Sequence, residues 1–126
     1  MLEDRINEAI SSKKTYLSDR LSRLGLVSAA VLNIIHWLVL LINIQPSREK
    51  ILLHFNVVYG ADLVAASFFL YLIPAVALVF FAVNLFLGSR LYNKNEKLAA
   101  YFLSSFSVLV QVIFLIATII LININA

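Results

Sequence analysis

The chain has 126 residues, of which 62% are hydrophobic and 13% are charged, and its formal net charge is +3. This scarcity of charge excludes an intrinsically disordered chain. The absence of cysteine excludes a disulfide scaffold and any zinc or iron–sulfur site built on thiolates. A mean hydropathy of +0.94 is typical of a membrane protein.

The first element in chain order is an amphipathic helix predicted over residues 1–23. Its apolar residues recur at steps of three and four, with Lys13 in the one polar slot of the stripe, and polar and charged residues occupy most of the positions between them. Three environments remain open for this apolar stripe: the cytoplasmic leaflet, the loops of its own chain, or a partner helix. The stripe consists of Leu2, Ile6, Ile10, Leu17, Leu21 and Leu24.

Three long apolar stretches follow, and none of them contains Asp, Glu, Lys or Arg. A helix needs about 20 residues to cross the hydrocarbon of a bilayer, and each stretch is at least that long. We therefore predict an all-α, polytopic integral membrane protein with transmembrane helices over residues 24–44, 63–87 and 98–122. The connecting segments are then an outer interfacial loop over residues 45–62, a cytoplasmic loop over residues 88–97 and an outer tail over residues 123–126.

The distribution of Lys and Arg predicts the orientation of these helices, because positively charged flanks resist translocation. With three spans, the N-terminal segment and the second loop lie on one side and carry eight of the 10 basic residues. The opposite side carries only Arg48 and Lys50. We therefore expect a multi-pass protein of the cell (inner) membrane with a cytoplasmic N-terminus and an outer C-terminus. Tyr92 and Tyr101 would then lie at the inner interface.

The basic residues that flank the spans on the predicted cytoplasmic side account for the net charge of +3. No basic stripe with interleaved aromatic residues is present, so we expect no nucleic-acid partner.

The outer loop begins with a turn at Pro46, because proline cannot continue the preceding helix. An apolar segment over residues 51–62 comes next, and it is too short to span a bilayer. Its β-branched and aromatic residues favour an extended, strand-like segment over a helical or re-entrant one. We expect this segment to lie in the outer interface.

Within this loop, the string Leu53-His54-Phe55-Asn56 is followed by Tyr59-Gly60 and then by Asp62. The pattern resembles that of uncharacterised small bacterial three-span membrane proteins, which more often have tyrosine where Phe55 stands. The resemblance implies an extramembrane loop between the first two spans, and it assigns no activity.

Three polar residues fall near the middle of the predicted helices, namely Asn33 and His36 in the first and Gln111 in the third. Unpaired polar groups are costly in hydrocarbon, so we expect them to face one another or other protein groups. One hypothesis is a polar path or small-ligand site with His36 as a proton carrier. The alternative, which we favour, is hydrogen bonding between helices, the usual role of Asn, Gln and His in membrane bundles.

A second candidate site lies in the outer loop and comprises His54, Asn56, Tyr59 and Asp62. Imidazole and carboxylate groups are common metal ligands, but two of them with one amide make a weak ligand set. We therefore expect Asp62 to cap the second helix, and His54 and Asn56 to satisfy backbone groups of the loop. No nucleophile paired with a base, glycine-rich phosphate loop or paired carboxylate predicts catalysis or a cofactor.

Small residues spaced four apart let membrane helices approach closely. These pairs leave open a homo-oligomer or a complex with another membrane protein, besides the lipid bilayer itself. We expect a non-enzymatic accessory or interaction subunit. The alternatives are an oligomeric transporter or channel that uses the midplane residues, and a membrane enzyme built on His54 and Asp62. The small-residue pairs are Gly25 with Ala29, Ala61 with Ala65, and Ala100 with Ser104.

Overall fold

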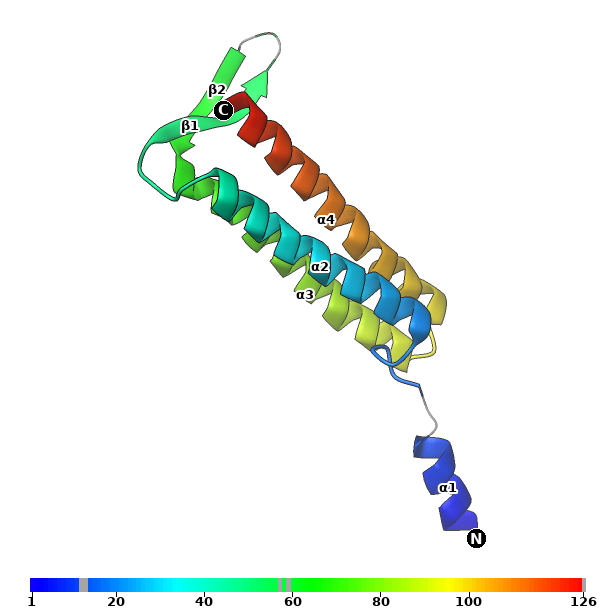
Figure 1. The fold of residues 1–126 in the computed structure, drawn as a ribbon. Coiled ribbons are helices and arrows are strands. Elements are labelled where there is room, and N and C mark those ends of the chain that lie inside the picture. The colour runs from blue at the N-terminus through cyan, green and yellow to red at the C-terminus, as the bar shows by residue number, and fades with distance from the viewer. Residues whose placement is uncertain (12–13, 57, 59, 126) are drawn as a thin grey trace.

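The computed structural model describes residues 1–11, 14–56, 58 and 60–125, and the side chains of these residues except at positions 9–11, 52–56 and 60–64. Two short strands interrupt an otherwise helical chain (Figure 1). The elements in chain order are α1 (Leu2–Ser11), α2 (Arg20–Asn43), β1 (Lys50–Asn56), β2 (Gly60–Ala66), the 3-10 helix η1 (Ser67–Tyr71), α3 (Leu72–Asn93) and α4 (Lys97–Asn125).

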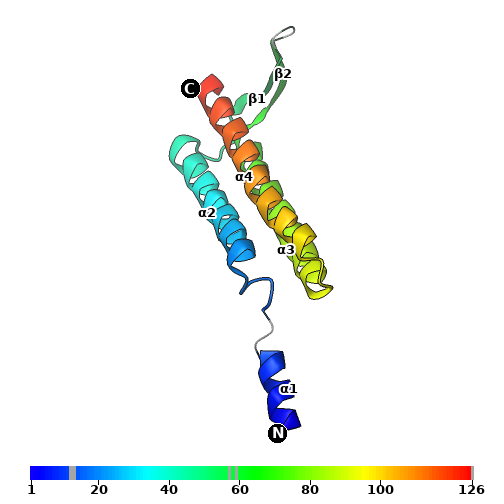
Figure 2. The same ribbon diagram turned by 90° about the vertical axis from the view of Figure 1, so that its right-hand side faces the viewer.

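Three helical segments are long and apolar enough to cross a membrane: Arg20–Asn43, Ser67–Asn93 and Lys97–Asn125. They lie side by side in both views (Figures 1 and 2), and α4 packs against both α2 and α3. The prediction of an all-α, multi-pass membrane protein with three spans is confirmed.

The bundle has two distinct ends (Figure 1). The α3–α4 turn lies at the end where α2 begins, and we call this the turn end. The hairpin of β1 and β2 lies at the other end with the C-terminus, and we call this the hairpin end. Because α2 and α4 both run from the turn end to the hairpin end, they are parallel, and α3 is antiparallel to both.

The single helix predicted over residues 1–23 is wrong. Helix α1 ends at Ser11 and α2 begins at Arg20, with a turn before it. In this turn the backbone N–H of Asp19 donates to the carbonyl of Thr15 at 3.0 Å, and Thr15 N–H donates to Ser18 Oγ at 2.7 Å. Ser and Thr hydroxyls compete with the helical hydrogen bonds of the backbone, which explains why the apolar stripe does not continue as one helix.

The helical part of the second predicted span begins later than expected, at Ser67, because the residues before it belong to the hairpin. Residues 63–66 belong to β2, which pairs antiparallel with β1, so that Lys50 lies opposite Ala66 and Asn56 opposite Gly60. The strand-like expectation for the loop agrees with this hairpin. Asp62 lies within β2, so the prediction that it caps a helix is wrong.

The two later helices extend beyond their predicted ends. Helix α3 continues to Asn93, and α4 runs from Lys97 to Asn125, so most of the predicted cytoplasmic loop and outer tail is helical. Hydropathy marks the part of a helix that matches hydrocarbon, whereas the helix itself can continue through the polar interface.

Small residues let α2 and α4 approach closely. A Cβ atom at Gly25 would meet the Oγ of Ser104 and would lie 3.1 Å from the backbone oxygen of the same residue. Ala29, Ala100 and Ser104 are buried. The pairs Gly25 with Ala29 and Ala100 with Ser104 therefore serve contacts within this chain. The pair Ala61 with Ala65 lies in β2 and is not a helical motif.

Ser67 connects the hairpin to the end of α2. Its Oγ accepts a hydrogen bond from Ser47 N–H at 2.9 Å and lies 3.0 Å from the carbonyl oxygen of Gln45. Its backbone N–H donates to the backbone carbonyl of Glu49 at 2.9 Å. The hydroxyl of Tyr71 donates to the carbonyl of Ile44. These bonds satisfy backbone groups that the chain exposes where α2 ends.

Candidate functional site

A pair of buried amides connects all three spans. Asn33 Nδ2 of α2 donates to Gln111 Oε1 of α4 at 3.0 Å and to the carbonyl oxygen of Pro74 in α3 at 3.1 Å. Gln111 Nε2 donates to the carbonyl oxygen of Ala77, also in α3, at 2.8 Å. Asn33 Oδ1 accepts from Trp37 Nε1 at 3.1 Å. The structure thus brings together two of the three predicted midplane residues.

His36 contacts another protein group, Thr118, and not Asn33 or Gln111. Its Nε2 lies 2.7 Å from Thr118 Oγ1, and its Nδ1 has no hydrogen-bond partner among the described atoms. Thr118 was not predicted as a site residue. A signal for it exists, because α2 and α4 are parallel and Thr118 stands at the i+7 position from Gln111, on the same helix face.

These contacts belong to a polar stripe on α4 that faces the centre of the bundle. Its members share the three- and four-residue spacing of one helix face, and all are buried. One level of the stripe binds α3, where Asn84 Nδ2 donates to Ser107 Oγ at 3.1 Å. Another binds α2, where Ser104 Oγ donates to the carbonyl of Ser22 at 2.9 Å. We call this stripe the α4 polar face, and it consists of Ser104, Ser107, Gln111 and Thr118.

The α4 polar face is buried inside the bundle. His36 and Gln111 are 0% and 1% exposed, so both side chains are almost completely covered by the protein. The outward surfaces of the three helices are apolar, as the exposed Ile34, Val79 and Ile113 illustrate. The arrangement holds helices together by hydrogen bonds where the surroundings supply no water, and this is the chemistry that the midplane residues perform here.

The outer candidate site is placed only by its backbone. His54 and Asn56 lie in β1, opposite Leu63 and Gly60, and Asp62 lies in β2 where the register is irregular. Tyr59 and the side chains of the other three lie outside the part that the structure describes. Among the described residues, no three His, Asp or Glu side chains gather as a metal site.

A buried carboxylate at the turn end joins the three spans and was missed by the sequence analysis. Asp19 Oδ2 accepts from the hydroxyls of Tyr92 in α3 at 2.9 Å and Tyr101 in α4 at 2.8 Å. Asp19 Oδ1 accepts from the backbone N–H groups of Leu21 at 3.0 Å and Ser22 at 3.5 Å, which caps α2. We call Asp19, Tyr92 and Tyr101 the Asp19 cluster.

Tyr16 packs beside this cluster. Its ring centroid lies 6.0 Å from that of Tyr92, and its hydroxyl donates to the carbonyl of Ala100 at 3.3 Å. The ring rests on Gly88, where a Cβ atom would overlap it. The turn before α2 is therefore fixed onto the ends of α3 and α4.

The surroundings of Asp19 favour its charged form. Burial acts to raise the pKa of its carboxyl, but the hydrogen bonds from Tyr101, Tyr92, Ser22 and Leu21 outweigh this effect and hold the pKa below its ordinary value of 3.8. An aspartate directly before a helix is a known N-cap signal, which could have found the capping role. The two tyrosines were predicted only as interfacial residues, and their common partner depends on tertiary packing.

Replacing Asp19 by asparagine is expected to lower the melting temperature of the protein in detergent. An amide can still cap α2, but it presents only one acceptor atom and loses the charge that strengthens the tyrosine bonds. Because the folded state lowers the pKa, the stabilisation by Asp19 is complete above its unfolded pKa of about 3.8 and is lost as the pH falls towards the folded value.

Thermal unfolding followed by circular dichroism at neutral pH and at pH 3 checks this prediction. The stability difference between wild type and Asp19→Asn should shrink at acidic pH. Glu96→Gln, an exposed carboxylate at the same end, is the matched control and should change little. A difference that stays constant across this range would contradict the role of the ionised carboxylate.

Comparisons with protein-family models, curated proteins and solved structures give no match for this chain. We therefore infer its function from the contacts of its own residues.

Proposed function

We propose that the protein is a non-enzymatic accessory or interaction subunit, and that the hairpin of β1 and β2 contacts its partner. The observation that carries this proposal is that, among the residues that the structure describes, each strand of the hairpin has one edge without a strand partner, because the sheet has two strands. Figure 2 shows the hairpin rising beyond the end of α4.

An isolated hairpin of this kind favours association. A two-stranded sheet is marginally stable in water by itself, and an unpaired edge presents N–H and C=O groups that another chain can bind. Most residues of β1 and β2 are apolar by type, which favours contact with a partner over contact with water. Pairing with a further strand would satisfy the edge, and this is a common way for sheets to recognise other chains.

The interior of the bundle supports a passive role over transport. A path for ions or small polar molecules needs polar groups that water or the substrate can reach. In this chain, Asn33, His36 and Gln111 are buried, and Asn33 and Gln111 are hydrogen bonded to one another. These bonds stabilise the bundle that carries the hairpin.

Helix α1 is proposed to lie on the membrane surface at the turn end, on the cytoplasmic side. Leu2 and Ile6 are one helical turn apart and are 74% and 48% exposed, so the bundle does not cover them. An interfacial position would bury these side chains in lipid while the charged side chains of α1 remain in water.

A photo-crosslinking amino acid tests the role of the hairpin. We would place it at Glu49, which is exposed beside β1, and as a control at Phe102, which is exposed on α4 at the turn end. Irradiation of native membranes is expected to give one discrete protein adduct from position 49 and lipid adducts from position 102. Lipid adducts alone from both positions would contradict the proposal.

A flux assay tests the rival function. Vesicles reconstituted with the protein are expected to show no proton or ion flux above that of empty vesicles. A flux that the protein produces and that His36→Ala abolishes would replace the accessory role with a transporter or channel.

A further inference from the structure

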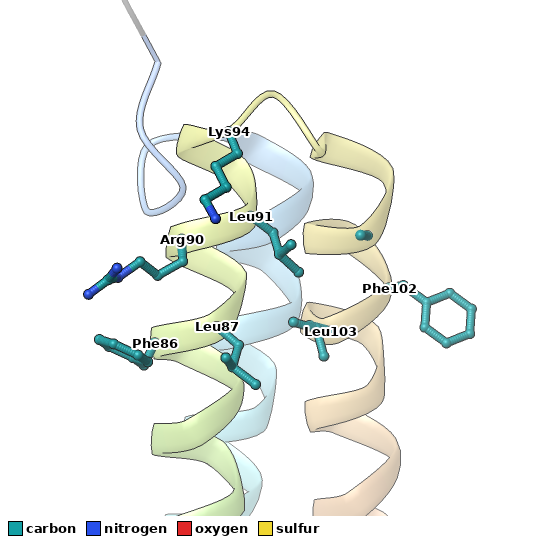
Figure 3. A pocket seen from close by; sticks show the side chains of 8 residues that line it. Phe86, Leu87, Arg90, Leu91, Lys94, Phe102 and Leu103 are labelled. Atoms are coloured by element: carbon teal, nitrogen blue, oxygen red, sulfur yellow. The ribbon is translucent and has the colours of Figure 1, made fainter.

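A surface groove lies between α3 and α4 at the turn end and has a volume of about 700 Å³ (Figure 3). This volume falls within the range of small-molecule binding sites. Leu87, Leu91 and Leu103 point into the groove between the two helices, and Phe86 and Phe102 stand at opposite rims. The part of the groove that lies deeper along the bundle is therefore apolar.

Two cations line the end of the groove nearest the turn. Arg90 lies in the last turn of α3, Lys94 directly follows this helix, and both are exposed. The guanidinium carbon of Arg90 lies 5.0 Å from the ring centroid of Phe86, and both side chains lie on the side of α3 that points away from α4 (Figure 3). Among the residues whose side chains the structure describes, the one ion pair joins the Met1 ammonium to Asp4. Arg90 and Lys94 thus have no carboxylate partner there.

The nearby acids cannot neutralise these cations. The Asp19 carboxylate is occupied by the hydroxyls of Tyr92 and Tyr101, and Glu96 forms no ion pair with Lys94. Long basic side chains at the end of a membrane helix place their charges at headgroup depth while their stems lie along the apolar surface. An occupant that fits must therefore combine a negative group at the interface with an apolar part extending into the hydrocarbon.

We propose that this groove binds an anionic phospholipid from the leaflet at the turn end. The lipid phosphate would be held between Arg90 and Lys94, and one acyl chain would lie on Leu87, Leu91 and Leu103. Guanidinium and ammonium groups are strong donors to phosphate oxygens. A zwitterionic lipid fits less well, because its own cationic headgroup competes with the two protein cations. This site does not depend on the proposed role of the hairpin.

Lipid retention by the purified protein tests the site. The protein in mild detergent would be titrated with phosphatidylglycerol and with phosphatidylcholine of the same acyl chains, and bound lipid would be counted by native mass spectrometry. Phosphatidylglycerol is expected to bind about 10-fold more tightly. The double variant Arg90→Gln, Lys94→Gln is expected to lose about 10- to 30-fold in affinity for phosphatidylglycerol, because each cation near the headgroups contributes about fivefold. Its affinity for phosphatidylcholine should not change.

The matched control is Arg20→Gln, Arg23→Gln, which removes the same charge from α2 at the same end of the bundle. This control should keep the phosphatidylglycerol affinity of the wild type. An equal loss in both double variants would overturn the site, because it would show general attraction of lipid to a basic surface. Unchanged binding in the Arg90, Lys94 variant would overturn it as well.

Two further experiments test whether the acyl chain is needed, one by filling the groove and one by offering a phosphate without acyl chains. Leu103→Trp and Ala99→Leu each fill the groove, and each should weaken the binding of both lipids. At least one of these two variants should keep the melting temperature of the wild type. Glycerol phosphate without acyl chains should not compete at the concentrations at which the lipid binds. Competition by glycerol phosphate equal to that of the lipid would show a free-phosphate site and would contradict the proposal.

Discussion

Replacing Gly25 by valine is expected to destabilise the bundle by about 1–3 kcal/mol, the usual cost of overpacking a well-packed core. A Cβ atom at this position would lie 3.1 Å from the backbone oxygen of Ser104 and closer still to its Oγ. The hydroxyl cannot move freely, because it donates to the carbonyl of Ser22 at 2.9 Å. The backbone oxygen belongs to α4 itself, so α2 and α4 would have to separate.

Thermal unfolding in detergent measures this effect. Leu24→Val introduces the same residue one position earlier, on a side chain that is 67% exposed, and should change the stability little. Gly25→Ala should cost less than Gly25→Val, because it adds one methyl group and valine is restricted to one main rotamer in a helix. A Gly25→Val protein as stable as the Leu24→Val control would contradict the close approach of α2 and α4.

Replacing Gln111 by leucine is expected to destabilise the bundle by about 1–2 kcal/mol, the range for hydrogen bonds between membrane helices. The change removes the acceptor of Asn33 and the donor to the carbonyl of Ala77, and both bonds join different spans. Asn43→Leu is the matched control, because Asn43 is exposed and donates only to Val39 of its own helix. This control should be neutral or stabilising.

A double-mutant cycle with Asn33→Leu separates the bond between the two side chains from their other contacts. The two substitutions should be non-additive by about 0.6–1.7 kcal/mol, because each one alone already breaks the bond between them. A higher melting temperature in Gln111→Leu would show that the amide does not bridge the helices.

The sequence was sufficient to predict the three spans, because a charge-free apolar stretch of this length has few alternatives in water or lipid. It did not predict that residues 63–66 form a strand. These residues are apolar and continue directly into the apolar second span, so neither charge nor hydropathy changes at Ser67. The start of α2 was missed for a similar reason, since the leucines of its first turn continue the stripe of α1.

The candidate site could be predicted in part. The cost of burying polar groups in hydrocarbon identified Asn33 and Gln111 as partners, but it could not distinguish which polar residue of α4 meets His36. That choice depends on the relative rotation and axial position of two helices that contact across 82 positions of sequence. The Asp19 cluster depends on the same geometry at the turn end, because its two tyrosines come from α3 and α4.

The most direct test of the account is the sidedness of the two ends of the bundle. The chain has no cysteine, so single-cysteine variants can be labelled without background. Glu49→Cys lies at the hairpin end and Glu96→Cys at the turn end, and both positions are exposed. In intact cells a membrane-impermeant maleimide is expected to label position 49, and to label position 96 only after permeabilisation. Labelling of both positions in intact cells, or of neither, would contradict three spans with the hairpin outside.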